Sequence, residues 1–255
     1  MKVILINKMN EEMIEKGYSV ECGFADNKKH FDHHGEYASF ASPCINTTIP
    51  IITNETIYVS HIDADSFIGI NRLLGKEIPS NLDLSLMQEI DLNGSSVVSN
   101  KFNPTLLYMV GVGQKTREYK FPRVTSEPQD ITSIIMDLLK LSTEEFIEAG
   151  RIATEKSEKA YTECLIKKQG NKALYSIGAN DPLDPSRPYE DDIDIVVVYR
   201  QHWKTISIYC NPKSQYAFGG SIVANIEFGG HPKACGSPRG VEMSLEQAIS
   251  VFETI

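Results

Sequence analysis

No long hydrophobic run occurs in the sequence, which excludes a conventional membrane-spanning helix. Such a helix needs about 18 or more consecutive apolar residues, and the 255-residue chain has no run of that length. The apolar run at residues 1–6 is too short for a signal peptide and is followed by polar residues, so it predicts a buried strand. We therefore expect a cytoplasmic protein without a membrane partner.

Cysteine is scarce and irregularly spaced. The cysteines are odd in number and include no Cys-x-x-Cys pair, which argues against a disulfide framework and against a cysteine zinc site. A reducing compartment fits this pattern. The five are Cys22, Cys44, Cys164, Cys210 and Cys235.

Positive charge is also in short supply, with 25 lysines and arginines against 34 aspartates and glutamates and a formal net charge of -9. Duplex nucleic acid is disfavoured as a partner, because that binding neutralises many phosphates. A single-strand nuclease would need a basic groove with stacking aromatics, and the only tryptophan is Trp203. A small phosphorylated substrate held through metal ions is compatible with this balance, and a short single-stranded oligonucleotide stays open as such a substrate.

The first candidate site follows a β-branched run at residues 56–59. One imidazole and two carboxylates, His61, Asp63 and Asp65, come next, and a helical pattern then begins at Phe67. At the carboxyl end of a strand, these side chains would lie where open α/β sheets bind ligands, and they suit Mn²⁺, Mg²⁺, Zn²⁺ or Fe. The alternative is two solvated carboxylates, with Asp65 or Ser66 capping the helix.

A second cluster of metal-binding residue types lies at residues 30–34. It contains half of the six histidines, and adjacent histidines point in different directions, so that one can bind a metal while the other faces a substrate. Surface histidines on a polar turn are the alternative. The presence of both clusters favours a metal site, and Asp91, after the helical pattern at 82–90, is a further candidate ligand or a turn residue.

The remaining pattern predicts an α/β protein. We expect strands at 18–24, 49–52, 173–177, 193–199 and 205–209, a helix beginning near 219–224, and a final helix capped by Ser244 with Gln247 three residues on. The run at 106–110 is ambiguous between helix and strand. We also expect a helical connector at about 130–169 and a domain boundary near Gly170, with domains at 1–169 and 170–255.

Three motifs together resemble the DHH/DHHA1 phosphoesterase superfamily. They are Asp32-His33-His34, the segment His61 to Asp65, and the segment Gly229 to Gly236, and the resemblance spans nearly the whole chain. It implies a doubly wound, mainly parallel α/β domain that carries one or two metal ions, with Mn²⁺ expected ahead of Mg²⁺ or another divalent ion. A smaller DHHA1-like α/β domain would bind the substrate phosphate.

The resemblance also implies roles for individual residues. His33, His61, Asp63 and Asp65 would bind metal, and Asp91 matches a further ligand. His34 would face the phosphate while Asp32 orients the imidazoles. In the second domain, Gly229, Gly230 and His231 would present backbone N–H groups and an imidazole to the anion.

The sequence departs from the family pattern in three respects. Asp-His-His precedes His-x-Asp-x-Asp, as if the domain were circularly permuted. The position of a bridging aspartate falls on Asn7. The arginine expected on a strand of the second domain is missing at 207–210, and Lys233 or Arg239 could supply its charge.

We therefore expect a metal-dependent phosphoester or phosphoanhydride hydrolase that acts on a short oligonucleotide, a nucleotide or pyrophosphate. His34, Asp32 and His231 would serve the reaction, and Gly229, Gly230, Lys233 and Arg239 would help to bind the substrate. The alternative is a weakened or inactive nucleotide- or phosphate-binding protein of the same fold. A homodimer is left open.

Overall fold

The computed structural model describes residues 1–119, 127–179, 183–238 and 240–255. The chain divides into two units, the first made of Met1–Leu92 and Val98–Ile152 and the second of Asn93–Val97 and Ala153–Ile255. The division falls inside helix α6 (Thr143–Glu163), earlier in the chain than the boundary expected near Gly170.

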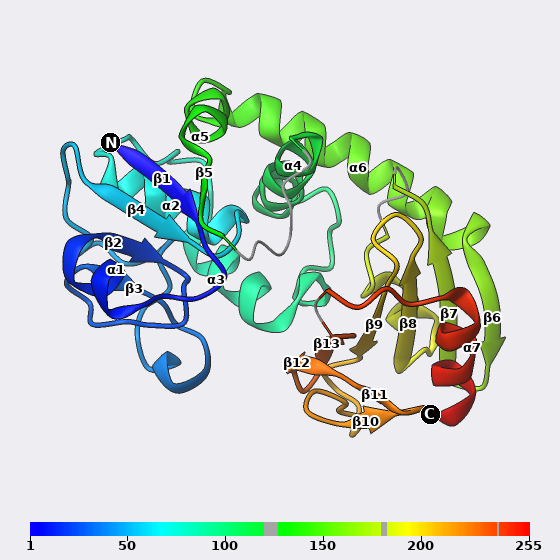
Figure 1. The fold of residues 1–255 in the computed structure, drawn as a ribbon. Helices are drawn as coiled ribbons and strands as arrows, with labels where there is room; N and C mark the ends of the chain where they lie inside the picture. Colours follow the sequence, from blue (N-terminus) through cyan, green and yellow to red (C-terminus); the bar gives the residue numbers. More distant parts are fainter. Residues whose placement is uncertain (120–126, 180–182, 239) are drawn as a thin grey trace. The chain divides into compact units, whose positions relative to one another are not determined.

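The first unit is built on a sheet in the order β3-β2-β4-β1-β5 (Figure 1). The first four strands in this order are parallel, and β5 runs antiparallel to β1. Their bounds are β1 (Lys2–Leu5), β2 (Tyr18–Val20), β3 (His30–Phe31), β4 (Thr56–Val59) and β5 (Gln129–Asp130). The mainly parallel sheet predicted for this part of the chain is confirmed.

Helices cover both faces of this sheet. Val3 and Leu5 of β1 join the main core with residues of α2 to α6, whereas Ile4 points to the other face and packs with α1. This alternation follows from the two-residue period of a strand. The helices of the first unit are α1 (Glu11–Lys16), α2 (Ala64–Leu73), α3 (Leu84–Asn93), α4 (Pro104–Glu118) and α5 (Thr132–Leu138), with the first part of α6 and a 3₁₀ turn at Gly35–Tyr37.

Two glycines allow α4 and α6 to approach closely. A Cβ atom on Gly111 would lie 1.8 Å from the carbonyl oxygen of Phe146, and one on Gly150 would lie 1.9 Å from that of Leu107. Both distances are far below van der Waals contact. The helix backbones therefore meet at a point where no side chain fits.

The second unit contains a mixed sheet in the order β12-β13-β9-β8-β7-β6. β7 and β8 are parallel, and the other neighbours are antiparallel. Helix α7 packs on one face through Ala248, Val251 and Phe252. The bounds are β6 (Leu165–Gln169), β7 (Lys172–Ile177), β8 (Ile195–Arg200), β9 (Thr205–Cys210), β12 (Gly229–His231), β13 (Ala234–Gly236) and α7 (Leu245–Thr254), with 3₁₀ turns at Ser95–Val97 and Arg187–Asp191.

Some local predictions are confirmed and others are wrong. Ser244 and Gln247 form the predicted capping box of α7. The expected strand at 49–52 is absent from the structure, where Ile51 is 72% exposed. The segment at 219–224 does not begin a helix but leads into a hairpin of β10 (Ile222–Val223) and β11 (Ile226–Glu227). Ala224 and Asn225 both have positive φ, as a two-residue type I′ turn requires.

No helix in the described ranges combines the length and the apolar character needed to cross a membrane.

Candidate metal centre

Seven ionisable side chains come together at the carboxyl ends of three neighbouring parallel strands. The side chains are Glu21, Asp32, His33, His34, His61, Asp63 and Asp65, and α3 adds Asp91. Carboxyl ends of parallel strands meet at one edge of a sheet, which is why segments distant in sequence converge there. The two clusters identified from sequence therefore belong to one site.

The first group surrounds His33. Its Nε2 lies 3.1 Å from Glu21 Oε1, 3.2 Å from Asp65 Oδ2 and 3.1 Å from Asp91 Oδ2. The His33, Glu21 and Asp65 side chains are almost completely buried, and 15% of the Asp91 side chain is exposed. One imidazole nitrogen thus faces three carboxylate oxygens, of which a single proton could satisfy only one.

These atoms fit a divalent cation. Within the described residues, five buried side-chain atoms make no hydrogen bond of acceptable geometry, and all five belong to the site: Glu21 Oε1, Glu21 Oε2, His33 Nε2, Asp65 Oδ2 and Asp91 Oδ2. Adjacent ligands of an octahedral ion, each at about 2.1 Å, lie about 3 Å apart. The distances of 3.1–3.2 Å between His33 Nε2 and the three carboxylate oxygens come without the angles of hydrogen bonds. Such distances are expected between neighbouring ligands of one metal ion.

The second group surrounds His61. Its Nε2 lies 3.2 Å from Glu21 Oε2 and 3.0 Å from Asp63 Oδ2. Its Nδ1 lies 2.8 Å from Ser60 Oγ, and that hydroxyl donates its own proton to the Glu21 carbonyl oxygen. Nδ1 must then carry the proton that is shared with Ser60, so the Nε2 lone pair is available to a metal.

Glu21 joins the two groups and was missed in the sequence. Its side chain is 1% exposed, with one carboxylate oxygen facing His33 and the other facing His61. The predicted strand at 18–24 ends at Val20, and Glu21 follows with a φ of 55°. Asn7, considered for the bridging position, is exposed after β1. The residue between the two groups is therefore a carboxylate.

Neighbouring groups hold the candidate ligands in place. Asp65 Oδ1 accepts hydrogen bonds from Ser42 Oγ at 2.7 Å and from the Cys44 N–H at 2.5 Å, which leaves Oδ2 facing His33. Asp63 Oδ1 accepts the Ser66 N–H at 2.9 Å in the capping box of α2, while Oδ2 faces His61. The helix cap is therefore Asp63, and Asp65 is buried rather than solvated.

Asp32 orients His34. Its Oδ1 accepts the His34 N–H at 2.8 Å and lies 3.2 Å from His34 Nδ1, and its Oδ2 accepts the Gly23 N–H at 2.6 Å. Because an ionised carboxylate only accepts, Nδ1 is the protonated nitrogen and Nε2 is the basic one. The His34 side chain is 34% exposed, so it lies at the mouth of the site.

Electrostatics explain why the cluster needs a cation. Burial raises the pKa of Glu21 to about 7, and the charge of Asp63 adds to this rise. Burial opposes charge on His33, but the facing oxygens of Asp65, Asp91 and Glu21 outweigh it and raise its pKa to about 12. The hydrogen bond that His34 donates to Asp32 raises the pKa of His34. Without a cation, protons held on His33 and His61, whose pKa values are both raised, compensate part of the buried negative charge.

Part of one face of the second unit's sheet carries polar side chains, while Ala173, Tyr175, Val196 and Val198 on the same face belong to an apolar core. Arg200 Nη1 donates to Ser207 Oγ at 2.9 Å, and Nη2 donates to Tyr209 Oη at 3.0 Å. Tyr209 pairs with Ala234, which pairs with His231, and directly paired residues share a face. The side chains of Arg200, Tyr209 and His231 therefore lie on one face, and we call the surface formed by these three residues the polar face.

The other predicted substrate-binding residues differ in their placement. Gly229 and Gly230 are exposed and belong to strand β12, so their backbone pairs with β13. Lys233 Nζ donates to the carbonyl oxygens of Ser214 at 2.5 Å and Tyr216 at 2.7 Å, which ties its ammonium group to the protein itself. Arg239 lies outside the described residues. Arg200, which sequence reasoning missed, is the arginine on the polar face.

Comparison with known proteins returns no matching family model and no matching curated protein. Solved structures do match. The chain is 12% identical to the pGpG-specific phosphodiesterase PggH of Vibrio cholerae, with a TM-score of 0.42, covering 80% of this chain and 78% of that one. An exopolyphosphatase-related protein of Bacteroides fragilis is 15% identical, with a TM-score of 0.35 and coverages of 88% and 61%.

RecJ of Thermus thermophilus, solved in complex with Mn²⁺, is 14% identical with a TM-score of 0.35, covering 73% of this chain and 28% of RecJ. These three proteins are DHH-family members. Because these TM-scores are below 0.5, the function proposed for this chain rests on its own side chains.

Proposed function

We propose that the protein is a divalent-metal-dependent hydrolase of phosphoesters or phosphoanhydrides, with Mn²⁺ as the expected metal. The observation that carries the proposal is Glu21. It is a buried carboxylate whose two unpaired oxygens each face a separate group of ligand atoms. Two such groups bridged by one carboxylate suit a pair of cations.

His33, Asp65 and Asp91 would hold one ion and His61 and Asp63 the other, with Glu21 shared. When bound, divalent ions make hydroxide available near neutral pH, orient the phosphate and stabilise charge on the leaving oxygen. The protein's own contribution is to fix these atoms before substrate arrives. The Asp65 hydrogen bonds and the Asp63 helix cap perform that task.

His34 is the side chain best placed to serve the substrate. Its Nδ1 proton is held by Asp32, and it is the partly exposed imidazole beside His33, with ring centres 4.3 Å apart. As an imidazolium it would donate a hydrogen bond from Nε2 to a phosphate oxygen and could pass a proton to the leaving group. The raised pKa of His34 favours that charged form.

The polar face of the second unit would bind the rest of the anionic substrate. Arg200 has five N–H donors, and its bonds to Ser207 and Tyr209 fix the plane of the guanidinium while leaving donors for phosphate. His231 on the same face would add a hydrogen bond. The substrate class proposed is therefore small and phosphorylated.

The deciding experiment is a Mn²⁺-supplemented hydrolysis screen against pyrophosphate, short oligonucleotides, cyclic dinucleotides and mononucleotides. We expect turnover of at least one class, its loss in EDTA, and two Mn²⁺ ions per chain by calorimetry. Glu21→Gln should lose at least a hundredfold in turnover and one bound ion. The matched control is Glu55→Gln, at the exposed amino end of β4.

Two outcomes would contradict the proposal. Full activity in Glu21→Gln would remove the shared carboxylate from the mechanism. Tight phosphate or nucleotide binding with no product in any assay would support the alternative, a binding protein of the same fold.

A further inference from the structure

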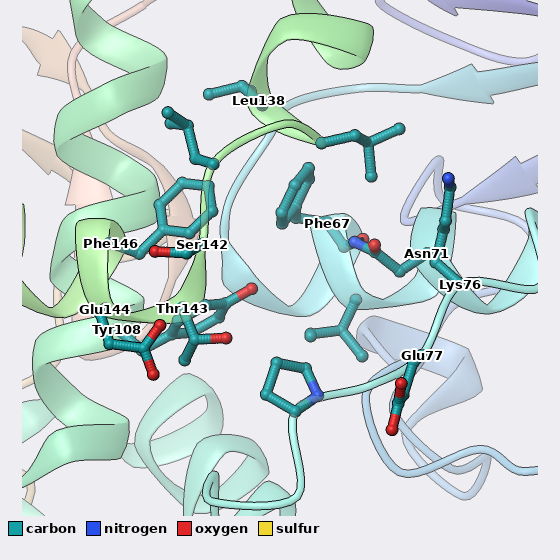
Figure 2. A pocket seen from close by; sticks show the side chains of 14 residues that line it. Phe67, Asn71, Lys76, Glu77, Tyr108, Leu138, Ser142, Thr143, Glu144 and Phe146 are labelled. Atoms are coloured by element: carbon teal, nitrogen blue, oxygen red, sulfur yellow. Dashed lines mark hydrogen bonds between the residues drawn. The ribbon is translucent and has the colours of Figure 1, made fainter.

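A cavity of about 340 Å³ lies in the first unit, and none of the candidate metal ligands lines it (Figure 2). Phe67 and Ile68 of α2, Tyr108 of α4, Leu138 of α5 and Phe146 of α6 supply its apolar walls. The ring centres of Phe67 and Tyr108 lie 5.6 Å and 5.4 Å from that of Phe146. Protein cavities that bind small molecules begin at roughly this size and have mainly apolar walls.

Tyr108 has an unusual environment for a tyrosine. The residue is 2% exposed, yet its hydroxyl makes no hydrogen bond with any described residue. Figure 2 shows this hydroxyl pointing into the cavity. The hydroxyl oxygen is not among the buried unpaired atoms of the described residues, so it remains accessible from the cavity and can donate to an acceptor that enters it.

The position of charge in the cavity restricts what could bind there. Lys76, Glu77 and Glu144 line the cavity but are exposed residues at its edge (Figure 2). The interior offers an uncharged donor, the Tyr108 hydroxyl, which is protonated at neutral pH and whose pKa is raised further by burial. A charged ligand would therefore lose hydration there without gaining a counterion.

We propose that this cavity is a binding site for a small, uncharged, largely apolar molecule whose hydrogen-bond acceptor takes the proton of the Tyr108 hydroxyl. None of the residues that line the cavity is a candidate metal ligand. The lining nevertheless includes Phe67 and Ile68, which follow the candidate ligand Asp65 on α2 by two and three residues.

The test uses acetophenone, an aromatic ring with a carbonyl acceptor, as the probe. Ethylbenzene lacks the acceptor and benzoate carries a charge. Saturation-transfer NMR on the full chain should show acetophenone binding in the millimolar range and weaker binding of both comparison compounds. Tyr108→Phe should weaken acetophenone binding about fivefold, the effect of one uncharged hydrogen bond.

Tyr119→Phe is the matched control, since Tyr119 is 38% exposed and does not line the cavity. It should bind acetophenone as the wild type does. Leu141→Trp, which places a larger side chain at the cavity wall, should abolish binding. Equal affinity in Tyr108→Phe and Tyr119→Phe, or no acetophenone binding at 10 mM (roughly ten times the dissociation constant expected for so small a ligand), would overturn the proposal.

Discussion

His33 Nε2 and Glu21 Oε1 lie 3.1 Å apart, and both side chains are only 1% exposed. The two residues follow the neighbouring strands β3 and β2. A buried carboxylate next to two more carboxylates is unfavourable unless positive charge accompanies it. The folded chain therefore contains a site whose stability depends on what occupies it.

We predict that Mn²⁺ stabilises the protein strongly. A ligand present at about 100 times its dissociation constant adds about 2.7 kcal/mol per site to the free energy of unfolding. Thermal unfolding followed by circular dichroism should show a higher Tm in Mn²⁺ than in EDTA, and the increase should be smaller in Glu21→Gln. The exposed variant Glu55→Gln should keep the full increase. A Tm that is the same with Mn²⁺ and with EDTA would contradict a buried metal site.

Asp63 offers a way to separate metal binding from helix capping. Its Oδ1 caps α2 while its Oδ2 faces His61. Asparagine caps a helix about as well as aspartate, whereas alanine loses about 1 kcal/mol. In EDTA, urea unfolding should therefore show Asp63→Ala to be less stable than Asp63→Asn by about that amount. In Mn²⁺, both variants should bind fewer ions than the wild type. If Asp63→Asn bound as many metal ions as the wild type, the Asp63 carboxylate would not be a metal ligand.

The candidate metal centre was only partly predictable from sequence, and Glu21 shows why. Sequence reasoning named His33, His61, Asp63, Asp65 and Asp91 as candidates, because His33 lies in a cluster of metal-binding residue types and the others follow a recognisable strand or helix pattern. The alternation at residues 18–24 made Glu21 look like the outward side chain of a strand. Strand pairing actually ends at Val20, and pairing depends on β3 and β4 rather than on the local sequence.

Arg200 was missed for a similar reason. The arginine was expected on the segment 207–210, which lies within β9. The antiparallel pairing of β8 with β9 instead brings Arg200, at the end of β8, beside Ser207 and Tyr209. Such long-range register leaves no signal in either segment alone.

Arg200→Gln should mainly weaken substrate binding. Hydrogen bonds to charged groups contribute about 1.5–3 kcal/mol, so KM should rise at least tenfold with a smaller change in kcat. Steady-state kinetics on the substrate found in the screen would measure both. Arg151→Gln is the control, because Arg151 lies on α6 in an exposed pair with Glu148. Unchanged KM in Arg200→Gln would exclude the polar face from substrate binding.

The close approach of α4 and α6 gives a prediction about the fold itself. A methyl group on Gly111 would overlap the Phe146 carbonyl oxygen at 1.8 Å, so Gly111→Ala must push the helices apart and should lose about 1–3 kcal/mol of stability. Gly113, two residues further along the same helix, has only Arg117 Nη1 within 4 Å of such a methyl group, at 3.8 Å. Gly113→Ala should therefore gain about 0.5–1 kcal/mol, the usual advantage of alanine over glycine in a helix. Urea unfolding of the two variants should shift in opposite directions, and a shift of both in the same direction would mean that α4 and α6 do not meet at Gly111.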